Sequence, residues 1–129
     1  MTVLNFKIIT SSTPMYNDPI NKIMINEALF GEEVCVLEKK KDWFLSILSR
    51  DNYKGWINSK NLGVLPIGNH KISTVRTFIK ASPSIKSKDI HYLSFESRVH
   101  VEEIIENWAK ITLSSKHSQQ FGYVYNNDL

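Results

Sequence analysis

The sequence repeats itself once, and this repeat constrains the fold more than any other feature of the chain. The segment "GWINSKNL", residues 55–62, returns as "GYVYNNDL", residues 122–129. Upstream of each, the two valines of "EEVCVLE" align with those of "SRVHVEE", and Trp43 aligns with Trp108, so the spacing between matching anchors is nearly constant. Anchors that recur in one order along the chain predict two copies of one small fold.

Each copy predicts short strands that are separated by turns. In the first copy, "EEVCVLE", "WFLSILS" and "GWIN" are typical of strands, while "KKKD" and "RDNYK" are typical of turns. The segment "SKNL" predicts one helical turn, with Ser59 as its cap, that returns Leu62 to the core. The second copy predicts strands at "SRVHVEE", "WAKITLS" and "GYVY", with a longer tip at "SKHSQQ". About five short strands per copy indicate an all-β chain of two small, strongly bent barrels in tandem.

The repeat also predicts the domain boundaries. We expect a first barrel over residues 1–63, in which residues 1–16 form an N-terminal extension, and a second barrel over residues 71–129. Residues 64–70 contain proline and glycine and form the natural linker. Because this linker is short and partly apolar, we expect the two barrels to pack closely.

Charge and hydropathy exclude several classes of function. The net charge of +3 is mild, and the single basic run, residues 39–41, lies between Glu38 and Asp42. This run indicates a solvated turn and not a nucleic-acid surface. No apolar run is long enough to span a membrane, and residues 1–16 lack the apolar core of a secretory signal. We therefore expect a soluble chain without membrane insertion, located in the cytoplasm.

The chain offers little catalytic chemistry. Its single cysteine, Cys35, lies in a strand between two valines, and no helix N-terminus is predicted to activate its thiol. The four histidines are too scattered to match a metal-ligand spacing; they are His70, His91, His100 and His117. We therefore predict no catalytic residues, no metal and no cofactor, and we do not expect this chain alone to be an enzyme.

The aromatic residues are the candidates for ligand binding, since aromatic faces give rigid contact area to peptides and sugars. With one neighbouring acid, the candidates are Trp43, Asp51, Tyr53, Trp56, Trp108 and Tyr123. Core filling and ligand contact remain equal alternatives for Trp56 and Tyr123. The position of Tyr53 at the polar tip "RDNYKG" favours a contact with a ligand or with another domain. Asp51 either holds a cationic group or shapes the turn.

The strand "WFLSIL" is apolar on both faces, unlike its counterpart "WAKITL". A barrel strand has only one inward face, so the second apolar face requires a cover. We expect Leu45 and Ile47 to form an interface, either with the second copy or with a further domain.

The order of these features resembles a bacterial SH3b domain: a proline turn, an aliphatic pair, a tryptophan strand, a Gly-aromatic-aliphatic strand and a closing turn with leucine. The resemblance begins near Asn17 and covers both copies, which implies two SH3-like barrels. Three segments carry a closer resemblance, to the paired N-terminal SH3b domains of NlpC-type cell-wall cysteine endopeptidases. They are "LFGEEVCVLEKKKDWF", "RDNYKGWI" and "VRTFIKASPSIKSKDIHYLSFESRVHV".

The resemblance implies the ligand class. NlpC-type enzymes cut peptidoglycan stem peptides between D-glutamate and a diamino acid, in a catalytic domain that follows the second SH3b domain. This chain ends at Leu129, where that domain would begin. Three alternatives follow from the resemblance: the chain is the targeting half of a larger enzyme, the product of a truncated gene, or a stand-alone binding protein. The resemblance implies a module that binds stem peptides or muropeptides, or that positions and restricts a peptidase domain. The alternatives are a structural or protein-interaction module with a polypeptide ligand, and a location in the cell envelope.

Overall fold

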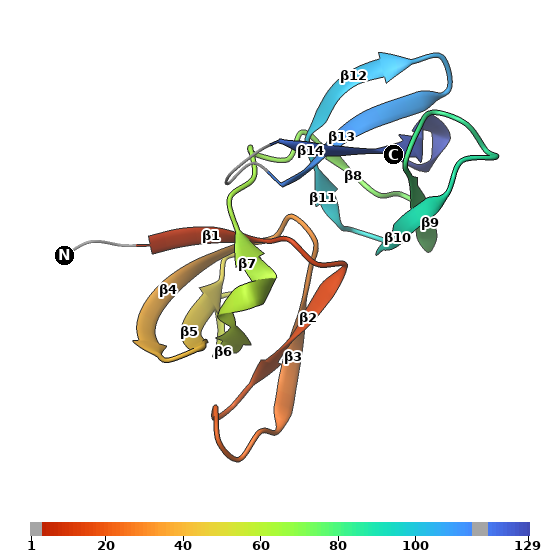
Figure 1. Ribbon diagram of the computed structural model, residues 1–129. Helices are drawn as coiled ribbons and strands as arrows, with labels where there is room; N and C mark the ends of the chain where they lie inside the picture. The colour runs from red at the N-terminus through yellow and green to blue at the C-terminus, as the bar shows by residue number, and fades with distance from the viewer. Residues whose placement is uncertain (1–3, 115–118) are drawn as a thin grey trace. The chain divides into compact units, whose positions relative to one another are not determined.

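The computed structural model describes residues 4–114 and 119–129. The chain divides into two compact units, Met1–Gly63 and Val64–Leu129, which we call the first and the second barrel (Figure 1). Both are built from short antiparallel strands, and the described residues contain no α-helix. The prediction of an all-β chain with two SH3-like barrels is confirmed.

The first barrel is one curled sheet of seven strands in the order β3-β2-β6-β5-β4-β1-β7. Its elements are β1 (Leu4–Ile8), β2 (Ser12–Tyr16), β3 (Met24–Leu29), β4 (Glu33–Lys40), β5 (Trp43–Leu48), β6 (Tyr53–Asn58), the 3₁₀ turn η1 (Ser59–Asn61) and β7 (Leu62–Gly63). Alternate residues of the strands point inward and are buried there. The core consists of Ile8, Met15, Ala28, Val34, Val36, Leu48, Ile57 and Leu62, with Phe6 and Phe44 packed against it.

Residues 4–16 are an integral part of this sheet and not an extension from it. Strand β1 pairs with β4 and β7, and β2 pairs with β3 and β6. Strand β2 buries Thr13 and Met15 on its inward face. Its sequence, "STPMY", has too few apolar residues for the alternation to stand out, so the local pattern does not reveal the strand.

The closing turn of the first barrel forms where expected but has a different cap. Residues Ser59–Asn61 form the 3₁₀ turn, and Leu62 behind it is buried. The cap is Asn58, whose Oδ1 accepts a hydrogen bond from Lys60 N at 3.1 Å. Ser59 instead donates its backbone N–H to Asp42 O at 2.8 Å. The prediction of Ser59 as the cap was therefore wrong by one position.

The second barrel contains a five-stranded sheet, in the order β10-β9-β14-β13-β12, and a two-stranded sheet, β11-β8. Its elements are β8 (His70–Lys71), β9 (Arg76–Lys80), β10 (Asp89–Ser94), β11 (Arg98–Val99), β12 (Val101–Ile105), β13 (Trp108–Ser114), β14 (Gln120–Tyr125) and the 3₁₀ turn η2 (Asn126–Asp128). The expected strand "SRVHVEE" is interrupted at His100. Of the tip "SKHSQQ", residues 115–118, with His117, lie outside the described residues.

Residues 64–70, expected to be a linker, contribute to the second barrel. Asn69 donates its backbone N–H to Val99 O at 2.9 Å, and His70 is the first residue of β8. These contacts attach the segment to β11, just as β1 is attached to β4 in the first barrel. Each barrel therefore begins with a strand, β1 or β8, that lies outside the segments aligned in the sequence repeat.

The backbone repeats more closely than the side chains do. Positive φ angles occur at Gly31 (80°) and Glu96 (74°), and again at Lys41 and Glu106 (54° each). The two members of each pair are separated by the same offset as the two repeated tryptophans. Left-handed backbone is uncommon for lysine and glutamate, so its recurrence shows that both copies make the same turns.

One buried polar contact is also duplicated, with its donor reversed. In the first barrel, Asn61 Nδ2 donates to the hydroxyl of Thr13 at 2.8 Å. In the second, the hydroxyl of Thr77 donates to Asp128 Oδ2 at 2.6 Å. Both threonines are buried, and each contact ties the closing 3₁₀ turn to the second strand of its barrel. The two halves are therefore two copies of one fold, down to the closing turn.

Candidate ligand-binding site

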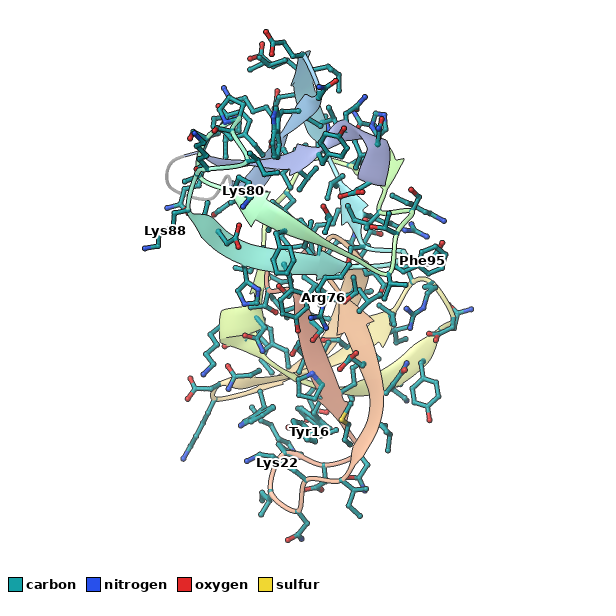
Figure 2. The ribbon with its side chains drawn as sticks, turned by 90° about the vertical axis from the view of Figure 1, so that its right-hand side faces the viewer. Tyr16, Lys22, Arg76, Lys80, Lys88 and Phe95 are labelled. Carbon is teal, nitrogen blue, oxygen red and sulfur yellow. The ribbon has the colours of Figure 1, made fainter. Side chains whose placement is uncertain are left out.

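A cavity of about 470 Å³ opens beside Trp43 in the first barrel. We call it the Trp43 pocket; its lining is Asp18, Pro19, Ile20, Lys40, Lys41 and Trp43. Tyr16 meets the Trp43 ring edge to face, with the ring centres 5.7 Å apart, and Lys22 Nζ lies 5.0 Å from the centre of that ring. Tyr16 and Lys22 lie close together at the end of the β2–β3 hairpin (Figure 2).

Local hydrogen bonds hold one wall of the Trp43 pocket. Asp18 Oδ1 accepts from the backbone N–H groups of Ile20 at 2.7 Å and Asn21 at 3.0 Å. Asn17 Oδ1 accepts from Ile23 N at 3.0 Å. Side chains of this kind fix turns by replacing backbone partners. The opposite wall is the tight β4–β5 turn, where Lys41 adopts its positive φ shortly before Trp43.

The same bonds set the charge of Asp18. Hydrogen bonds from Ile20 N and then Asn21 N stabilise the carboxylate, so they lower the pKa of Asp18 below its ordinary value of 3.8. The positive charge of Lys40 acts in the same direction. At neutral pH Asp18 is therefore ionised and committed to its turn.

Replacing Asp18 with asparagine is expected to flatten the acid side of the stability curve. A carboxylate whose folded-state pKa is lowered contributes stability above its unfolded pKa, and this contribution is lost as the pH falls through the folded-state pKa. Asparagine keeps the Oδ1 acceptor but cannot titrate. Urea unfolding between pH 2 and 7 measures the effect, and NMR titration of the Asp18 carboxyl carbon locates its pKa. A value at or above 3.8 would contradict the prediction.

A second cavity, of about 530 Å³, lies beside Trp108 in the second barrel. We call it the Trp108 pocket; its lining is Thr77, Phe78, Lys80, Ile85, Asn107, Trp108, Tyr125 and Asp128. The rings of Trp108 and Tyr125 meet edge to face, 5.8 Å apart and at 74°. Trp108 begins β13 as Trp43 begins β5, and both follow a turn with positive φ. The two linings therefore share the aligned tryptophans but differ otherwise. The Trp43 pocket extends toward Asp18 and the β4–β5 turn, whereas the Trp108 pocket extends toward Thr77 and the closing turn η2.

The structure places two further aromatic candidates differently. Trp56 is buried, opposite Leu45 in the β5–β6 pair, with Lys40 Nζ 5.4 Å from its ring centre. It lies on the face of the sheet that carries Leu45, opposite the face of the core residue Ile57, and does not line the Trp43 pocket. Tyr123 is half-buried on β14, opposite Lys110 of β13 and Lys80 of β9. It does not line the Trp108 pocket.

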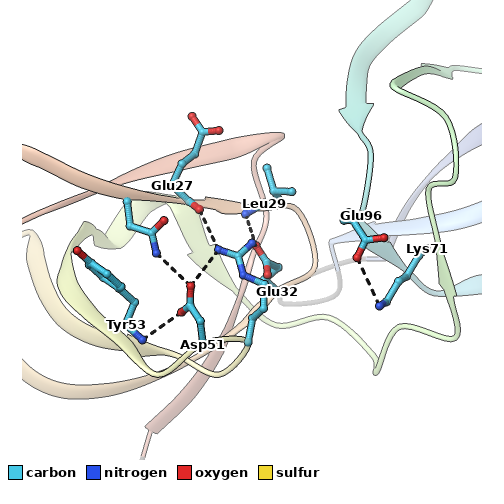
Figure 3. Close-up of polar contacts among 9 residues, drawn as sticks. Glu27, Leu29, Glu32, Asp51, Tyr53, Lys71 and Glu96 are labelled. Atoms are coloured by element: carbon cyan, nitrogen blue, oxygen red, sulfur yellow. Dashed lines mark hydrogen bonds and ion pairs between the residues drawn. The ribbon is translucent and has the colours of Figure 1, made fainter.

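Asp51 and Tyr53 lie at the other end of the β5–β6 hairpin. Trp43 pairs with Asn58 at one end and Leu48 pairs with Tyr53 at the other, which separates the ends by about 16 Å. Asp51 accepts hydrogen bonds from Tyr53 N at 3.1 Å, Asn26 Nδ2 at 3.5 Å and Arg50 Nη2 at 3.5 Å (Figure 3). These are the contacts of a turn-shaping residue, whereas the Tyr53 side chain is exposed.

The two interface candidates are half-buried on β5. Leu45 lies opposite Glu38 and Trp56, and Ile47 lies opposite Cys35 and Lys54. Phe44 and Leu48, on the other face, contribute to the core as expected. The role of Leu45 and Ile47 in an interface stays a prediction.

Sequence reasoning missed lining residues of the two pockets, among them Lys40, Lys41, Phe78, Ile85 and Tyr125. It also missed Tyr16 and Lys22, which contact the Trp43 ring. A signal was present for the loops, since Asp18-Pro19 aligns with Ser82-Pro83. It indicated a turn but not that the turn forms a pocket wall.

The described residues offer no metal-binding constellation: they contain no group of three histidine, cysteine, aspartate or glutamate side chains suited to an ion. In the same part of the chain, no helix has the length and apolar character that crossing a membrane requires. Cys35 is a free, half-buried thiol.

Comparisons with known proteins identify the fold. Residues 15–62 match the family of the bacterial dipeptidyl-peptidase SH3 domain. An NlpC/P60 family protein from Bacillus cereus superposes with a TM-score of 0.73 at 17% identity, over 97% of this chain and 55% of its own. NlpC2 and NlpC1 from Trichomonas vaginalis give TM-scores of 0.41 and 0.42 at 16% identity. They cover 98% and 99% of this chain and 47% and 45% of their own. No curated protein matches the sequence.

The chain thus spans about half the length of the NlpC/P60 structures that it resembles. The family match covers the first barrel from β2 to the closing turn, and the Bacillus structure shares the fold of both barrels. The chain is therefore a tandem of two SH3-like barrels that resembles the SH3b part of NlpC/P60 proteins, a peptidase-associated family.

Proposed function

We propose that this tandem binds peptidoglycan stem peptides and so positions an NlpC-type peptidase domain on them. The observation that carries the proposal is that each barrel has a pocket lined by its copy of the repeated tryptophan, Trp43 or Trp108. Two tryptophan-lined pockets of similar volume favour a ligand that repeats or extends, as the peptides of a cross-linked wall do. The resemblance to NlpC/P60 proteins supplies the ligand class.

The size and lining of the pockets support a peptide ligand. Cavities of about 470 and 530 Å³ fall within the range of about 300–1,000 Å³ that is typical of sites for small ligands. A tryptophan ring lines each pocket, together with Pro19 and Ile20 in the first barrel and with Phe78, Ile85 and Tyr125 in the second. Lysine and aspartate side chains also line both pockets. This mixture suits a backbone with alternating apolar and charged groups.

Titrating the chain with muropeptides, with and without a free L-Ala end, tests the proposal. We expect the indole N–H signals of Trp43 and Trp108 to shift in NMR spectra, because these rings line the pockets. Trp43→Ala and Trp108→Ala should each remove the shifts of one barrel and leave those of the other, so each variant controls for the folding of its partner. Shifts confined to Asp51 and Tyr53 would move the site to the hairpin tip.

No shift at millimolar muropeptide would refute binding of stem peptides. If the chain then binds an NlpC-type catalytic domain, and Leu45→Ser and Ile47→Ser weaken that binding, the interaction-module alternative becomes the better account. Circular dichroism of each variant checks that the barrels remain folded.

A further inference from the structure

The charges that face the Trp43 pocket are predominantly positive. Lys40 and Lys41 line the cavity, and Lys22 Nζ lies over the Trp43 ring. The acid in the lining, Asp18, is held by the two backbone N–H groups of its own turn. Asp42, in the same turn as Lys41, is exposed and does not line the cavity.

The lysines at this pocket retain unused hydrogen-bond donors. Lys40 approaches Glu38 at 4.0 Å, with both side chains at least half exposed. Within the described residues, no carboxylate lies within 4.0 Å of the ammonium groups of Lys22 or Lys41. Contact with an aromatic face orients an ammonium group but does not consume its three N–H donors. The Trp43 pocket therefore presents donors beside an apolar wall.

The second barrel shows that the fold does not require these charges. In the second copy, the positions equivalent to Lys40 and Lys41 are Ile105 and Glu106, and Glu106 adopts the same left-handed backbone as Lys41. The lysine in the Trp108 lining, Lys80, is paired with an aspartate on the neighbouring strand, Asp89. One backbone thus accepts either set of charges, so the turn of the first barrel does not require its lysines.

We propose that the Trp43 pocket binds an acidic peptide segment, with a carboxylate at Lys40 and Lys41 and the adjacent apolar side chain against Trp43. The Trp108 pocket, in contrast, does not distinguish charged from neutral peptides. This inference rests on the proposed function for its assumption that the ligand is a peptide. It adds the chemical class of peptide that the first barrel recognises. Opposite charges at the rim of an apolar site add specificity and attraction at modest energy.

The probes are N-acetyl-leucyl-glutamate, which carries two carboxylates, and its diamide, which carries none. The Trp43 indole N–H signal should report binding of the acid about fivefold tighter than binding of the diamide at 20 mM NaCl. At 0.5 M NaCl the difference should largely vanish, because the screening length falls to about 4 Å. The Trp108 signal should show no preference between the two probes.

The double variant Lys40→Gln/Lys41→Gln should lose the preference for the acid while keeping the binding of the diamide. Lys54→Gln/Lys60→Gln removes two exposed lysines of the same barrel outside the pocket lining and should keep the preference, which excludes an effect of net charge alone. Equal binding of the acid and the diamide by the unmodified chain would overturn the inference. So would an unchanged preference in the Lys40/Lys41 variant, or no shift of the Trp43 signal with 20 mM of either probe.

The two proposals fail separately. If the acid binds at Trp43 but stem peptides do not bind, the wall function is wrong and the anionic specificity stands. If stem peptides bind while the acid and the diamide behave alike at Trp43, the wall function stands and the anionic specificity is wrong.

Discussion

Replacing Gly122 with alanine is expected to lower the free energy of unfolding by about 2–3 kcal/mol. Gly122 lies in the middle of β14, beside Ile79 of β9. A Cβ atom at this position would overlap Ile79 Cγ2 and approach Leu113 Cδ1 at 3.1 Å. Ile79 is buried, and its β-branched side chain has few alternative rotamers. The strands would therefore have to separate, which disrupts the packing of the second barrel.

The equivalent substitution in the first barrel, Gly55→Ala, provides the matched comparison. Its Cβ would meet Met15 Cβ at 3.0 Å and Tyr16 O at 3.3 Å. The added methyl group is tight but overlaps no atom, and methionine adapts its shape more readily than isoleucine. We expect a cost of about 1 kcal/mol, below that of Gly122→Ala.

Urea unfolding distinguishes the two variants when each barrel has its own reporter. Trp108 reports on the second barrel, and Trp43 and Trp56 report on the first. We expect Gly122→Ala to lower the transition midpoint of the Trp108 signal most strongly. If Gly122→Ala costs no more than an ordinary surface substitution, or less than Gly55→Ala, the close approach of β9 to β14 does not require glycine.

The strands that the sequence predicted are those in which buried apolar residues alternate with exposed residues. Val34 and Val36 of β4 and Ile57 of β6 are buried, as are Val99 and Val124 at equivalent positions of the second copy. The two-residue period of a strand exposes this pattern. The sequence did not predict strand β2, because its inward face includes Thr13, a polar residue. The hydroxyl of the buried Thr13 accepts a hydrogen bond from Asn61, which is distant in sequence. Local patterns do not contain such a partner.

Alignment of the two copies predicted equivalent positions but not equivalent burial. Phe30 and Phe95 align, yet Phe30 is 3% exposed and Phe95 is 53% exposed. Both follow the third strand of their barrel, and both donate a backbone N–H to the residue just before the second strand, Ser11 or Val75. The backbone is therefore conserved between the copies while the surroundings of the side chains differ. Tertiary neighbours, and not the repeat itself, determine these surroundings.

The candidate site shows the same limit. Trp43 and Trp108 were recognised as binding candidates, because a repeated tryptophan is a strong signal. The lysine run at residues 39–41 indicated only a solvated turn, because nothing local reveals that Asp18-Pro19 faces it across a cavity. Tyr16 and Lys22 reach Trp43 from a different hairpin, through the pairing of β2 with β6. Those contacts require the sheet.

Arg50→Met is expected to lower the free energy of unfolding by about 2–3 kcal/mol, because it leaves a buried carboxylate without its cation. Glu32 has a side chain only 4% exposed, and its Oε1 accepts from Leu29 N at 2.7 Å and from Arg50 Nη1 at 2.9 Å (Figure 3). Arg50 also approaches Glu27 O at 3.5 Å. The guanidinium thus ties the β5–β6 tip to the turn before β4.

The matched variant Glu32→Gln keeps the shape and the acceptor oxygen but removes the charge, so it should cost about 1 kcal/mol. The double variant Arg50→Met/Glu32→Gln should be more stable than the sum of the two losses predicts, by about 1 kcal/mol or more, because the uncompensated charge is gone. Lys7→Met is the control: the carboxylate that it leaves without a cation, Glu33, is 44% exposed, so the substitution should cost at most about 1 kcal/mol.

Chemical denaturation of the four variants closes this cycle. If the losses in free energy of unfolding for Arg50→Met and Glu32→Gln are additive in the double variant, the two side chains are not coupled. The prediction that their ion pair stabilises the first barrel would then be wrong. The second barrel offers one comparison. It has Ser97 at the position equivalent to Glu32, and the buried Ser97 hydroxyl has no hydrogen-bond partner among the described residues. The same turn therefore forms without an ion pair, so the pair stabilises the first barrel but is not required by the fold.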